Sequence, residues 1–348
     1  MKLTTTHMLS FASDYMEGAH PALLEKLTVT NMEQSAGYGL DEYSTSAKEK
    51  IKSACNVPNG EVYFLVGGTQ TNALVIKSLL SSYEGVIAAD TGHISTHEAG
   101  AIELGGHKVL TLPHTYGKIS ATQITKLMET YWNDENHDHI VKPGMVYISQ
   151  PTEYGTLYSL EELTAIHKVC ENYKLPLYID GARLAYALSC PENDVTLEDL
   201  GRLCDAFYIG GTKCGALFGE ALVFTKANTV PHFFTIIKQN GALLAKGRLL
   251  GLQFDILFTN NLYETIGQHG TAMARKLRIA LQNKNYTLAF PSPTNQIFVT
   301  LTNEAYDQLT KHCAVSFWER IDENHVIIRL ATSWATNEDD VDALIGLL

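Results

Sequence analysis

Four short stretches combine glycine with residues that bind ligands or exchange protons. They are Gly67–Asn72 (G-G-T-Q-T-N), Asp90–His93 (D-T-G-H), Asp180–Arg183 (D-G-A-R) and Gly210–Lys213 (G-G-T-K). Each follows a short run of aliphatic, β-branched or aromatic residues, which predicts a buried strand. In an open parallel sheet, ligands bind at the carboxyl ends of the strands. The sequence therefore predicts that the four stretches lie close together in one site.

The first stretch suits an anion such as phosphate. Gly67 and Gly68 leave backbone N–H groups accessible, Thr69 adds a hydroxyl, and the predicted helix over 73–80 contributes the positive end of its dipole. An ordinary strand-to-helix turn with a capping threonine is the alternative. The stretch matches neither the Walker loop nor G-x-G-x-x-G, which argues against a nucleotide-binding enzyme.

Lys213 and Asp180 suggest covalent chemistry with a ring-containing cofactor. A lysine at the end of a buried strand is costly unless it is paired or used covalently, and a desolvated lysine is the residue that forms Schiff bases. Asp180 could keep a ring nitrogen protonated, and Arg183 could bind a carboxylate. The alternatives are a lysine that reaches water and an internal pair between Asp180 and Arg183.

His93 supplies an aromatic ring at a third strand end, with a purely structural histidine as the alternative. The neighbouring His97-Glu98 does not begin an H-E-x-x-H motif, because Ala101 stands in place of the second histidine, so no metal is expected. A phosphate-type loop, a flat aromatic residue, an aspartate and a lysine are together the set that pyridoxal phosphate requires.

The elements that position these residues alternate between strands and helices. A capping box of Ser159 and Glu162 begins the clearest helix, 159–173, and the alternation predicts a mostly parallel α/β sheet covered on both faces. After Gly251 we expect one long helix over 252–282 and a small α+β unit. The predicted domains are 1–250, an N-terminal arm and large cofactor-binding domain, and 251–348, a small C-terminal domain. The expected strands are 62–66, 86–89, 145–149, 177–180, 206–209, 221–224, 296–300 and 326–330.

Composition limits the partners. The 348 residues carry a formal net charge of −12, which argues against nucleic acid or an anionic membrane as the main partner. Six cysteines without a C-x-x-C pair predict reduced thiols. No apolar run suits a membrane span, and Met1 to Asp14 does not read as a signal peptide, so a cytoplasmic protein is expected.

A set of motifs extends along nearly the whole chain. It consists of Phe11–Asp14, Gly37–Gly39 with Asp41, Gly68-Thr69 with Asn72, Gly92–Gly100, Gln150–Glu153 with Gly155, Asp180–Arg183, Gly210–Lys213, Lys238-Gln239 with Lys246, and Arg329 with Ser333-Trp334. These motifs resemble those of the L-threonine aldolases of the β-eliminating lyase group, especially the low-specificity and phenylserine-type branch. The D-G-A-R and G-G-T-K pair is fairly specific for this family.

The resemblance implies the aspartate-aminotransferase-like fold (fold type I) and cleavage of L-threonine, L-allo-threonine and related β-hydroxy-α-amino acids to glycine and an aldehyde. It implies that Lys213 binds pyridoxal 5'-phosphate covalently, Asp180 faces the ring nitrogen and His93 stacks on the ring. It also implies a homodimer or homotetramer with active sites at the subunit interface, where Tyr38 reaches the neighbouring site. The other implied cofactor ligands are Gly68, Thr69, Arg183, Thr212 and Lys246. The implied substrate ligands are Ser13, Arg183 and Arg329, which bind the carboxylate, together with Tyr38.

Two positions depart from the pattern. Glu153 stands where many members have a histidine, so either His93 or a water held by Glu153 is the candidate catalytic base. Lys246 stands where an arginine binds phosphate, a role that lysine also fills as a point charge. The residues alone permit transamination as well as aldol cleavage. Other β-eliminating or serine-hydroxymethyltransferase-like enzymes, a nucleotide-binding Rossmann enzyme and a cofactor-free interaction protein are the rivals.

Overall fold

The computed structural model describes residues 8–348, and its largest part is a seven-stranded sheet with the strand order β2-β8-β7-β6-β5-β3-β4. The five strands from β7 to β4 are parallel, whereas β8 is antiparallel to both β7 and β2. The expected mostly parallel α/β sheet is therefore confirmed, and β4 is a strand that was not predicted from the sequence. The strands are β2 Glu61–Leu65, β3 Glu84–Ala89, β4 Val109–Leu112, β5 Lys142–Ser149, β6 Leu177–Asp180, β7 Ala206–Gly210 and β8 Glu220–Phe224.

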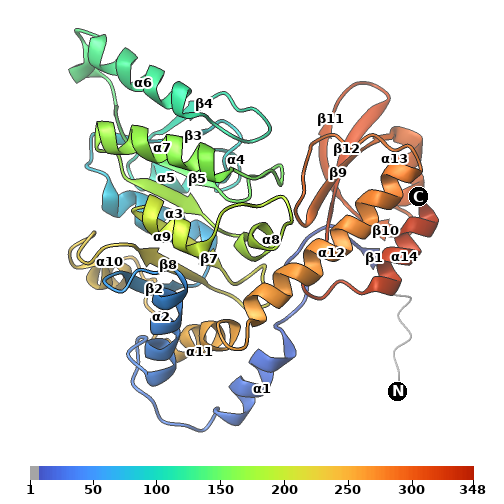
Figure 1. Cartoon of the computed structure of the whole chain (residues 1–348), viewed down its shortest axis with the longest axis horizontal. Helices are drawn as coiled ribbons and strands as arrows, with labels where there is room; N and C mark the ends of the chain where they lie inside the picture. The colour runs from blue at the N-terminus through green and yellow to red at the C-terminus, as the bar shows by residue number, and fades with distance from the viewer. Residues whose placement is uncertain (1–7) are drawn as a thin grey trace.

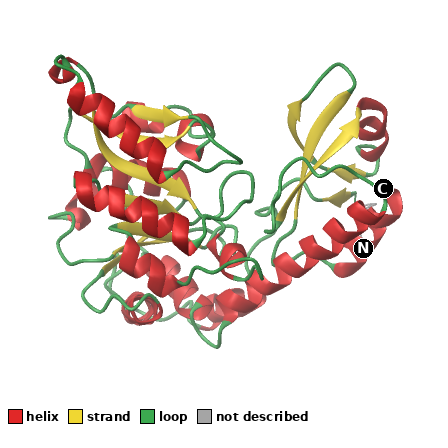
Figure 2. Cartoon of the chain, turned by 45° about the horizontal axis from the view of Figure 1, so that its top comes forward, coloured by secondary structure: helices red, strands yellow, loops and turns green. Residues whose placement is uncertain are grey.

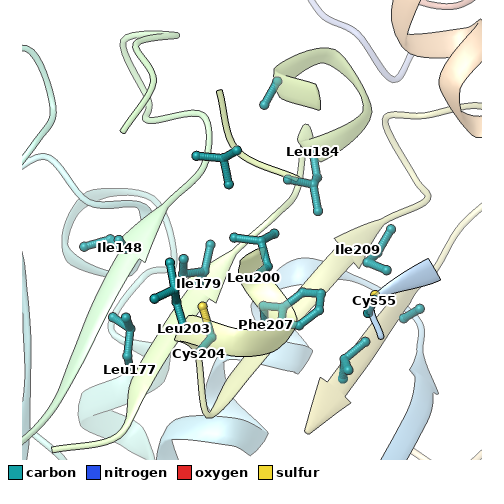
Figure 3. Packing of buried hydrophobic residues seen from close by; sticks show 14 of the residues in the cluster. Cys55, Ile148, Leu177, Ile179, Leu184, Leu200, Leu203, Cys204, Phe207 and Ile209 are labelled. Atoms are coloured by element: carbon teal, nitrogen blue, oxygen red, sulfur yellow. The ribbon is translucent and has the colours of Figure 1, made fainter. Parts of the chain in front are cut away.

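Helices cover both faces of this sheet (Figure 1). Successive strand residues point to opposite faces, so Ile87 joins one buried cluster and Val86 joins the other. Figure 3 shows the first cluster, where Phe207 and Ile179 of the sheet pack beside Leu200 of α9. The helices of this part are α1 Pro21–Val29, α2 Glu42–Ala54, α3 Gly68–Leu79, α4 His93–Thr96, α5 Ala101–Leu104, α6 Ala121–Asn133, α7 Leu160–Tyr173, α8 Leu184–Leu188, α9 Leu197–Leu203, α10 Phe233–Gln239 and α11 Arg248–Leu257, with a 3-10 turn at His137–His139.

A smaller unit with its own core follows (Figure 2). Its antiparallel sheet has the order β11-β12-β9, and α12 runs from the large sheet's helices to this unit (Figure 1). The start of the described chain belongs here as well, because β1 pairs with β10 and Phe11 is buried in the same core. The elements are β1 Leu9–Ser10, α12 Leu262–Asn283, β9 Gln296–Thr302, α13 Asn303–Leu309, β10 Cys313–Ala314, β11 Ser316–Arg320, β12 His325–Ala331 and α14 Glu338–Leu347.

The single long helix expected over 252–282 is wrong. The chain forms α11 and α12 instead, separated at Phe258–Asn261. Asn260 and Asn261 both have positive φ, 52° and 58°, a conformation that asparagine tolerates and that interrupts a right-handed helix. The capping box at Ser159 and Glu162 is confirmed, since each side chain bonds the other's backbone N–H.

All six cysteines are buried and free, as expected. Within residues 8–348, no helix has the length and apolar character needed to cross a membrane. The expectation about a signal peptide falls partly on Met1–His7, which lie outside the described residues. The division into domains at residue 250 stays a prediction.

Candidate active site

The carboxyl ends of the parallel strands bring the predicted residues to one edge of the large sheet. Asp180 ends β6, and Lys213 follows the adjacent β7 by three residues. His93 begins α4 after β3, and Glu153 lies in the loop after β5. Because β2 and β7 are both antiparallel to β8, Gly68 at the start of α3 emerges at the same edge. The topology thus assembles residues that are up to 145 positions apart (Lys213 and Gly68).

Asp180 is a buried carboxylate with four hydrogen-bond donors around it. Tyr147 donates to Oδ2 at 2.7 Å, Asn72 donates to Oδ2 at 3.1 Å, the Ala182 N–H donates to Oδ1 at 3.0 Å, and Tyr208 also donates to Oδ1. Burial acts against its charge, but the charge of His93 and the tyrosine hydrogen bonds hold the pKa of Asp180 below its usual value. Asp180 is therefore suited to face a protonated ring nitrogen.

His93 is connected to Asp180 through two buried side chains. Its Nδ1 lies 2.9 Å from Oε1 of Glu98, and Asn72 donates to that same Oε1 at 2.7 Å as well as to Asp180. Burial opposes protonation of His93, but the hydrogen bond to Glu98 and the charges of Glu153 and Asp180 raise its pKa. A carboxylate on Nδ1 fixes the tautomer, which leaves Nε2 as the nitrogen that can accept a proton.

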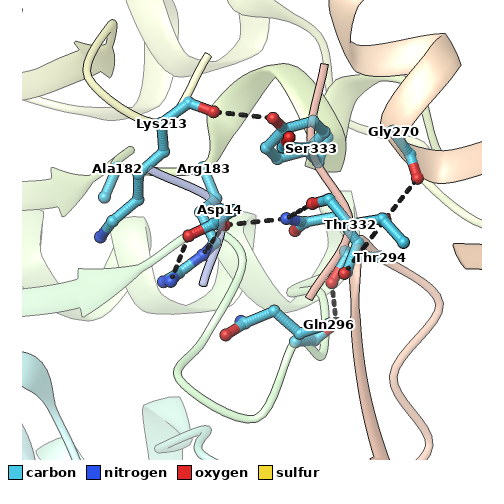
Figure 4. Close-up of polar contacts among 12 residues, drawn as sticks. Asp14, Ala182, Arg183, Lys213, Gly270, Thr294, Gln296, Thr332 and Ser333 are labelled. Atoms are coloured by element: carbon cyan, nitrogen blue, oxygen red, sulfur yellow. Dashed lines mark hydrogen bonds and ion pairs between the residues drawn. The ribbon is translucent and has the colours of Figure 1, made fainter. Parts of the chain in front are cut away.

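Arg183 pairs with Asp14, and the alternative of a pair with Asp180 is wrong. Nε of Arg183 lies 2.6 Å from Oδ2 of Asp14, and Nη2 lies 3.0 Å from Oδ1 (Figure 4). Burial acts against the charge of Asp14, yet Arg183 and Lys213 lower its pKa to about 2. The two-point pair fixes the plane of the guanidinium.

Arg329 approaches the same region from β12. Nη1 donates to Oε1 of Gln296 at 3.0 Å, and Nη2 donates to the Ala12 carbonyl at 3.2 Å. The charge of Arg183 helps to lower the pKa of Arg329, after burial, so the two cationic side chains lie near each other. Ser13 Oγ and Arg329 Nε are both buried without a partner among the described residues, so both atoms are available to a ligand anion.

Glu220 accepts hydrogen bonds from the segment that carries Lys213. The Gly211 N–H donates to Oε2 at 3.0 Å and the Thr212 hydroxyl to Oε1 at 2.8 Å. The hydroxyl of Thr212 also accepts from the Gly219 N–H at 3.0 Å, so its expected role as a cofactor ligand stays a prediction. Nζ of Lys213 lies 5.8 Å from the ring centre of Tyr15.

At the start of α3, Gly67 is the N-cap and no side chain caps the helix. The alternative of a capping Thr69 is therefore wrong; the side chain of Thr69 is exposed. A Cβ added at Gly68 would lie 3.0 Å from the hydroxyl of Tyr208. Glycine at position 68 therefore allows the start of α3 to lie close to Tyr208, which donates to Asp180.

Tyr38 and Lys246 form a second, separate group on an exposed surface. The Tyr38 N–H donates to the Ala245 carbonyl at 3.0 Å, and Nζ of Lys238 lies 4.6 Å from the Tyr38 ring centre. A cavity of about 940 Å³ lies elsewhere, beside Lys50 and Tyr263, and none of the predicted site residues lines it.

Comparison with known proteins identifies the class of this site. The sequence model of the β-eliminating lyase family matches residues 10–304. The chain belongs to the β-eliminating lyase family. As a member of this family it is a pyridoxal-phosphate-dependent lyase.

Relatives of the same length support the membership. The low specificity L-threonine aldolases of Pseudomonas aeruginosa and a Pseudomonas species are 29% and 30% identical, and each alignment covers 98% of this chain and 97% of the relative. A Leishmania major threonine aldolase structure is 43% identical with a TM-score of 0.94, covering 97% and 98% of the two chains. A Thermus thermophilus aspartate aminotransferase shares the fold alone, with a TM-score of 0.72 at 12% identity, covering 98% and 90%.

The residues at this edge fit the family's cofactor. A phosphorylated pyridine aldehyde needs an amine, a carboxylate for the ring nitrogen and an anion loop, and Lys213, Asp180 and the glycine-led start of α3 are of these types. The space next to Gly67 is open, since an added Cβ there meets no atom within 4 Å. The individual assignments stay predictions.

Six buried residues of the site had no role predicted from the sequence. Asp14, Asn72 and Glu98 lie within quoted motifs, but nothing local indicates their partners. Tyr147, Tyr208 and Glu220 lie on or beside predicted strands, where inward-facing polar atoms are indistinguishable by sequence from outward-facing ones.

Proposed function

We propose that this protein cleaves L-threonine, L-allo-threonine and related β-hydroxy-α-amino acids to glycine and an aldehyde. The observation that carries the proposal is the full-length likeness to low specificity L-threonine aldolases, together with a buried aspartate at the end of β6, a lysine just after the adjacent β7, and two arginines in the same region. Pyridoxal phosphate, when bound, supplies an electron sink conjugated to the substrate amine.

The substrate carboxylate binds between Arg183 and Arg329, next to Ser13. Arg183 is held in one orientation by Asp14, and Arg329 by Gln296 and the Ala12 carbonyl. Two positioned guanidiniums fix the substrate's orientation and thereby decide which bond at Cα breaks. The unpartnered Ser13 Oγ and Arg329 Nε supply two further donors.

The proton of the substrate β-hydroxyl passes to His93 or to a water held by Glu153. His93 presents Nε2 because Glu98 occupies Nδ1. Glu153 is close enough for its charge to act on His93, Arg183 and Arg329. A histidine whose pKa lies near the operating pH is an effective general base. His93 is therefore our first choice for this role.

Lys213, Asp180, Gly68, Thr69 and Thr212 bind the cofactor within one subunit. Tyr38 and Lys246 lie in a separate exposed group, so we propose that they serve the site of a second copy in a homodimer or a larger even assembly. Exposed apolar side chains in the same part of the chain support this: Met32 is 88% and Leu40 is 66% exposed. Light scattering of the purified protein tests the assembly.

The test of the reaction is to incubate the cofactor-loaded protein with L-threonine and with L-allo-threonine. We expect equal amounts of acetaldehyde and glycine. Formation of 2-oxobutyrate and ammonia would indicate elimination, and an amino-group transfer that needs an added oxo acid would indicate an aminotransferase. Either result without acetaldehyde contradicts the proposed reaction.

A further inference from the structure

Gln296, the first residue of β9, is fully buried, and one end of its amide has no partner. Its Oε1 accepts from Nη1 of Arg329 at 3.0 Å, whereas Nε2 finds no acceptor among the described residues. This orientation is required because arginine only donates hydrogen bonds; turning the amide over would set two donors against each other. The position of Arg329 therefore explains why Nε2 of Gln296 is the end of the amide that has no partner.

Other unpartnered donors lie in the same region. Nε of Arg329 is buried without a partner, and so is Oγ of Ser13, the residue after Ala12, whose carbonyl accepts from Arg329. In Figure 4 the side chain of Gln296 extends from β9 toward the side where Arg183 and Asp14 lie. Buried polar groups normally have partners, so several free donors together indicate an anion that completes them.

Two consecutive residues connect β9 to both arginines. Asn295 donates to Oδ2 of Asp14 at 2.8 Å, and Asp14 in turn fixes Arg183. Gln296 fixes Arg329. The start of β9 thus sets the spacing of the two guanidiniums, and the amide of Gln296 adds a neutral donor beside them. A third cation there would be repelled by the other two, whereas an amide is not.

We propose that Nε2 of Gln296 donates a hydrogen bond to the α-carboxylate of the amino-acid substrate and thereby selects ligands that carry a planar carboxylate. The amino-acid nature of the ligand rests on the proposed function. A carboxylate offers about four acceptor positions on its two oxygens, so it accommodates this donor as well as those of the arginines and Ser13.

The decisive variant is Gln296→Glu. Glutamate keeps the acceptor for Arg329 but places a negative oxygen where Nε2 lies, so a residue that only positions Arg329 would tolerate it. We expect the dissociation constant of glycine, measured from the absorption spectrum of the cofactor-loaded protein, to rise at least about tenfold, as does the KM for L-threonine. The affinity for 1-aminopropan-2-ol, which lacks the carboxylate, should stay within about twofold.

Gln308→Glu is the matched control, because Gln308 lies in α13 of the same small unit and its Oε1 accepts from exposed Lys311. It makes the same charge change and should leave glycine affinity unaltered. Wild-type glycine affinity in Gln296→Glu overturns the proposal, and so does an equal loss of affinity for 1-aminopropan-2-ol. Gln296→Met, of similar volume and without a donor, should also weaken glycine binding.

The wild-type protein offers a test that needs no folded variant. With glutamine side chains labelled with ¹⁵N, glycine binding should shift one side-chain amide signal strongly, and the absence of any such shift contradicts the proposal. These binding measurements also separate the inference from the proposed reaction. If the wild type releases no acetaldehyde but glycine binding depends on Gln296, the reaction assignment fails and the inference stands.

Discussion

Arg183 forms its two-point ion pair with Asp14, 169 residues earlier in the chain, and not with Asp180 in its own D-G-A-R motif. The pair leaves Asp180 to Tyr147, Tyr208, Asn72 and the Ala182 N–H. We therefore expect the two carboxylates to have different roles, with Asp14 orienting Arg183 for the substrate and Asp180 available for the cofactor.

Replacing Asp14 with asparagine should destabilise the protein by about 3–5 kcal/mol, because it leaves the buried Arg183 charge uncompensated. Urea unfolding followed by circular dichroism measures the change. Asp199→Asn removes a partly exposed carboxylate from its pair with Arg202 and should cost about 1 kcal/mol or less. Equal losses of unfolding free energy in the two variants would show that the pair of Asp14 and Arg183 contributes no more to stability than a partly exposed pair.

Replacing Glu98 with glutamine should lower the pKa of His93, because the hydrogen bond to Glu98 is the main influence that raises it. If neutral His93 is the base, the acidic limb of the pH–rate profile moves to lower pH. NMR titration of the histidine ring protons checks the pKa directly. Glu103→Gln, at an acidic residue of α5, should leave both observations unchanged, and an unshifted limb in Glu98→Gln would assign the base role elsewhere.

Tyr147→Phe and Tyr208→Phe each remove one hydrogen bond to the buried carboxylate of Asp180. We expect each to lower the free energy of unfolding by about 1–3 kcal/mol and to weaken cofactor binding, since the pKa of Asp180 rises when a donor is lost. Equilibrium unfolding and cofactor dissociation measure the two effects. The control is Tyr83→Phe, where the side chain is largely exposed, and wild-type behaviour of both buried variants would rule out a role for the tyrosines.

Burial raises the pKa of Glu220 to about 8 from its ordinary 4.5, although Thr212, Gly211 and Lys213 act against the shift. The folded state therefore binds this proton more tightly than the unfolded state, and the wild type loses stability as the pH rises from about 4.5 to about 8. In Glu220→Gln this loss should be absent, so the variant gains on the wild type over that range by a few kcal/mol, on the order set by the shift. Parallel stability–pH curves for the two proteins would contradict the assignment.

The sequence predicted the strand ends well because local patterns determine them. Apolar runs of about four residues ended at Asp180 and before the G-G-T-K motif, and the structure has β6 and β7 at these places. Right-handed connections between parallel strands then bring the ends to one edge. The positions of the anion loop, Asp180 and Lys213 follow from these local patterns.

Long-range partners could not be predicted in the same way. The contact of Asp14 with Arg183 and Asn295 depends on how the segment between β1 and α1 lies against the loop after β6 and the start of β9. The free amide end of Gln296 depends on which way Arg329 points. The prediction of one long helix over 252–282 failed for a local reason. Asn260 and Asn261 are compatible with a helical sequence pattern, but both adopt positive φ.

The proposed chemistry depends above all on Lys213 binding the cofactor beside Asp180. Borohydride reduction of the cofactor-loaded protein, followed by proteolysis and mass spectrometry, locates the modified residue. We predict a pyridoxyl phosphate group on the peptide that contains Lys213, and no such group in Lys213→Ala. A modified peptide elsewhere in the chain, or an undiminished yield of it in the variant, would contradict the assignment of Lys213.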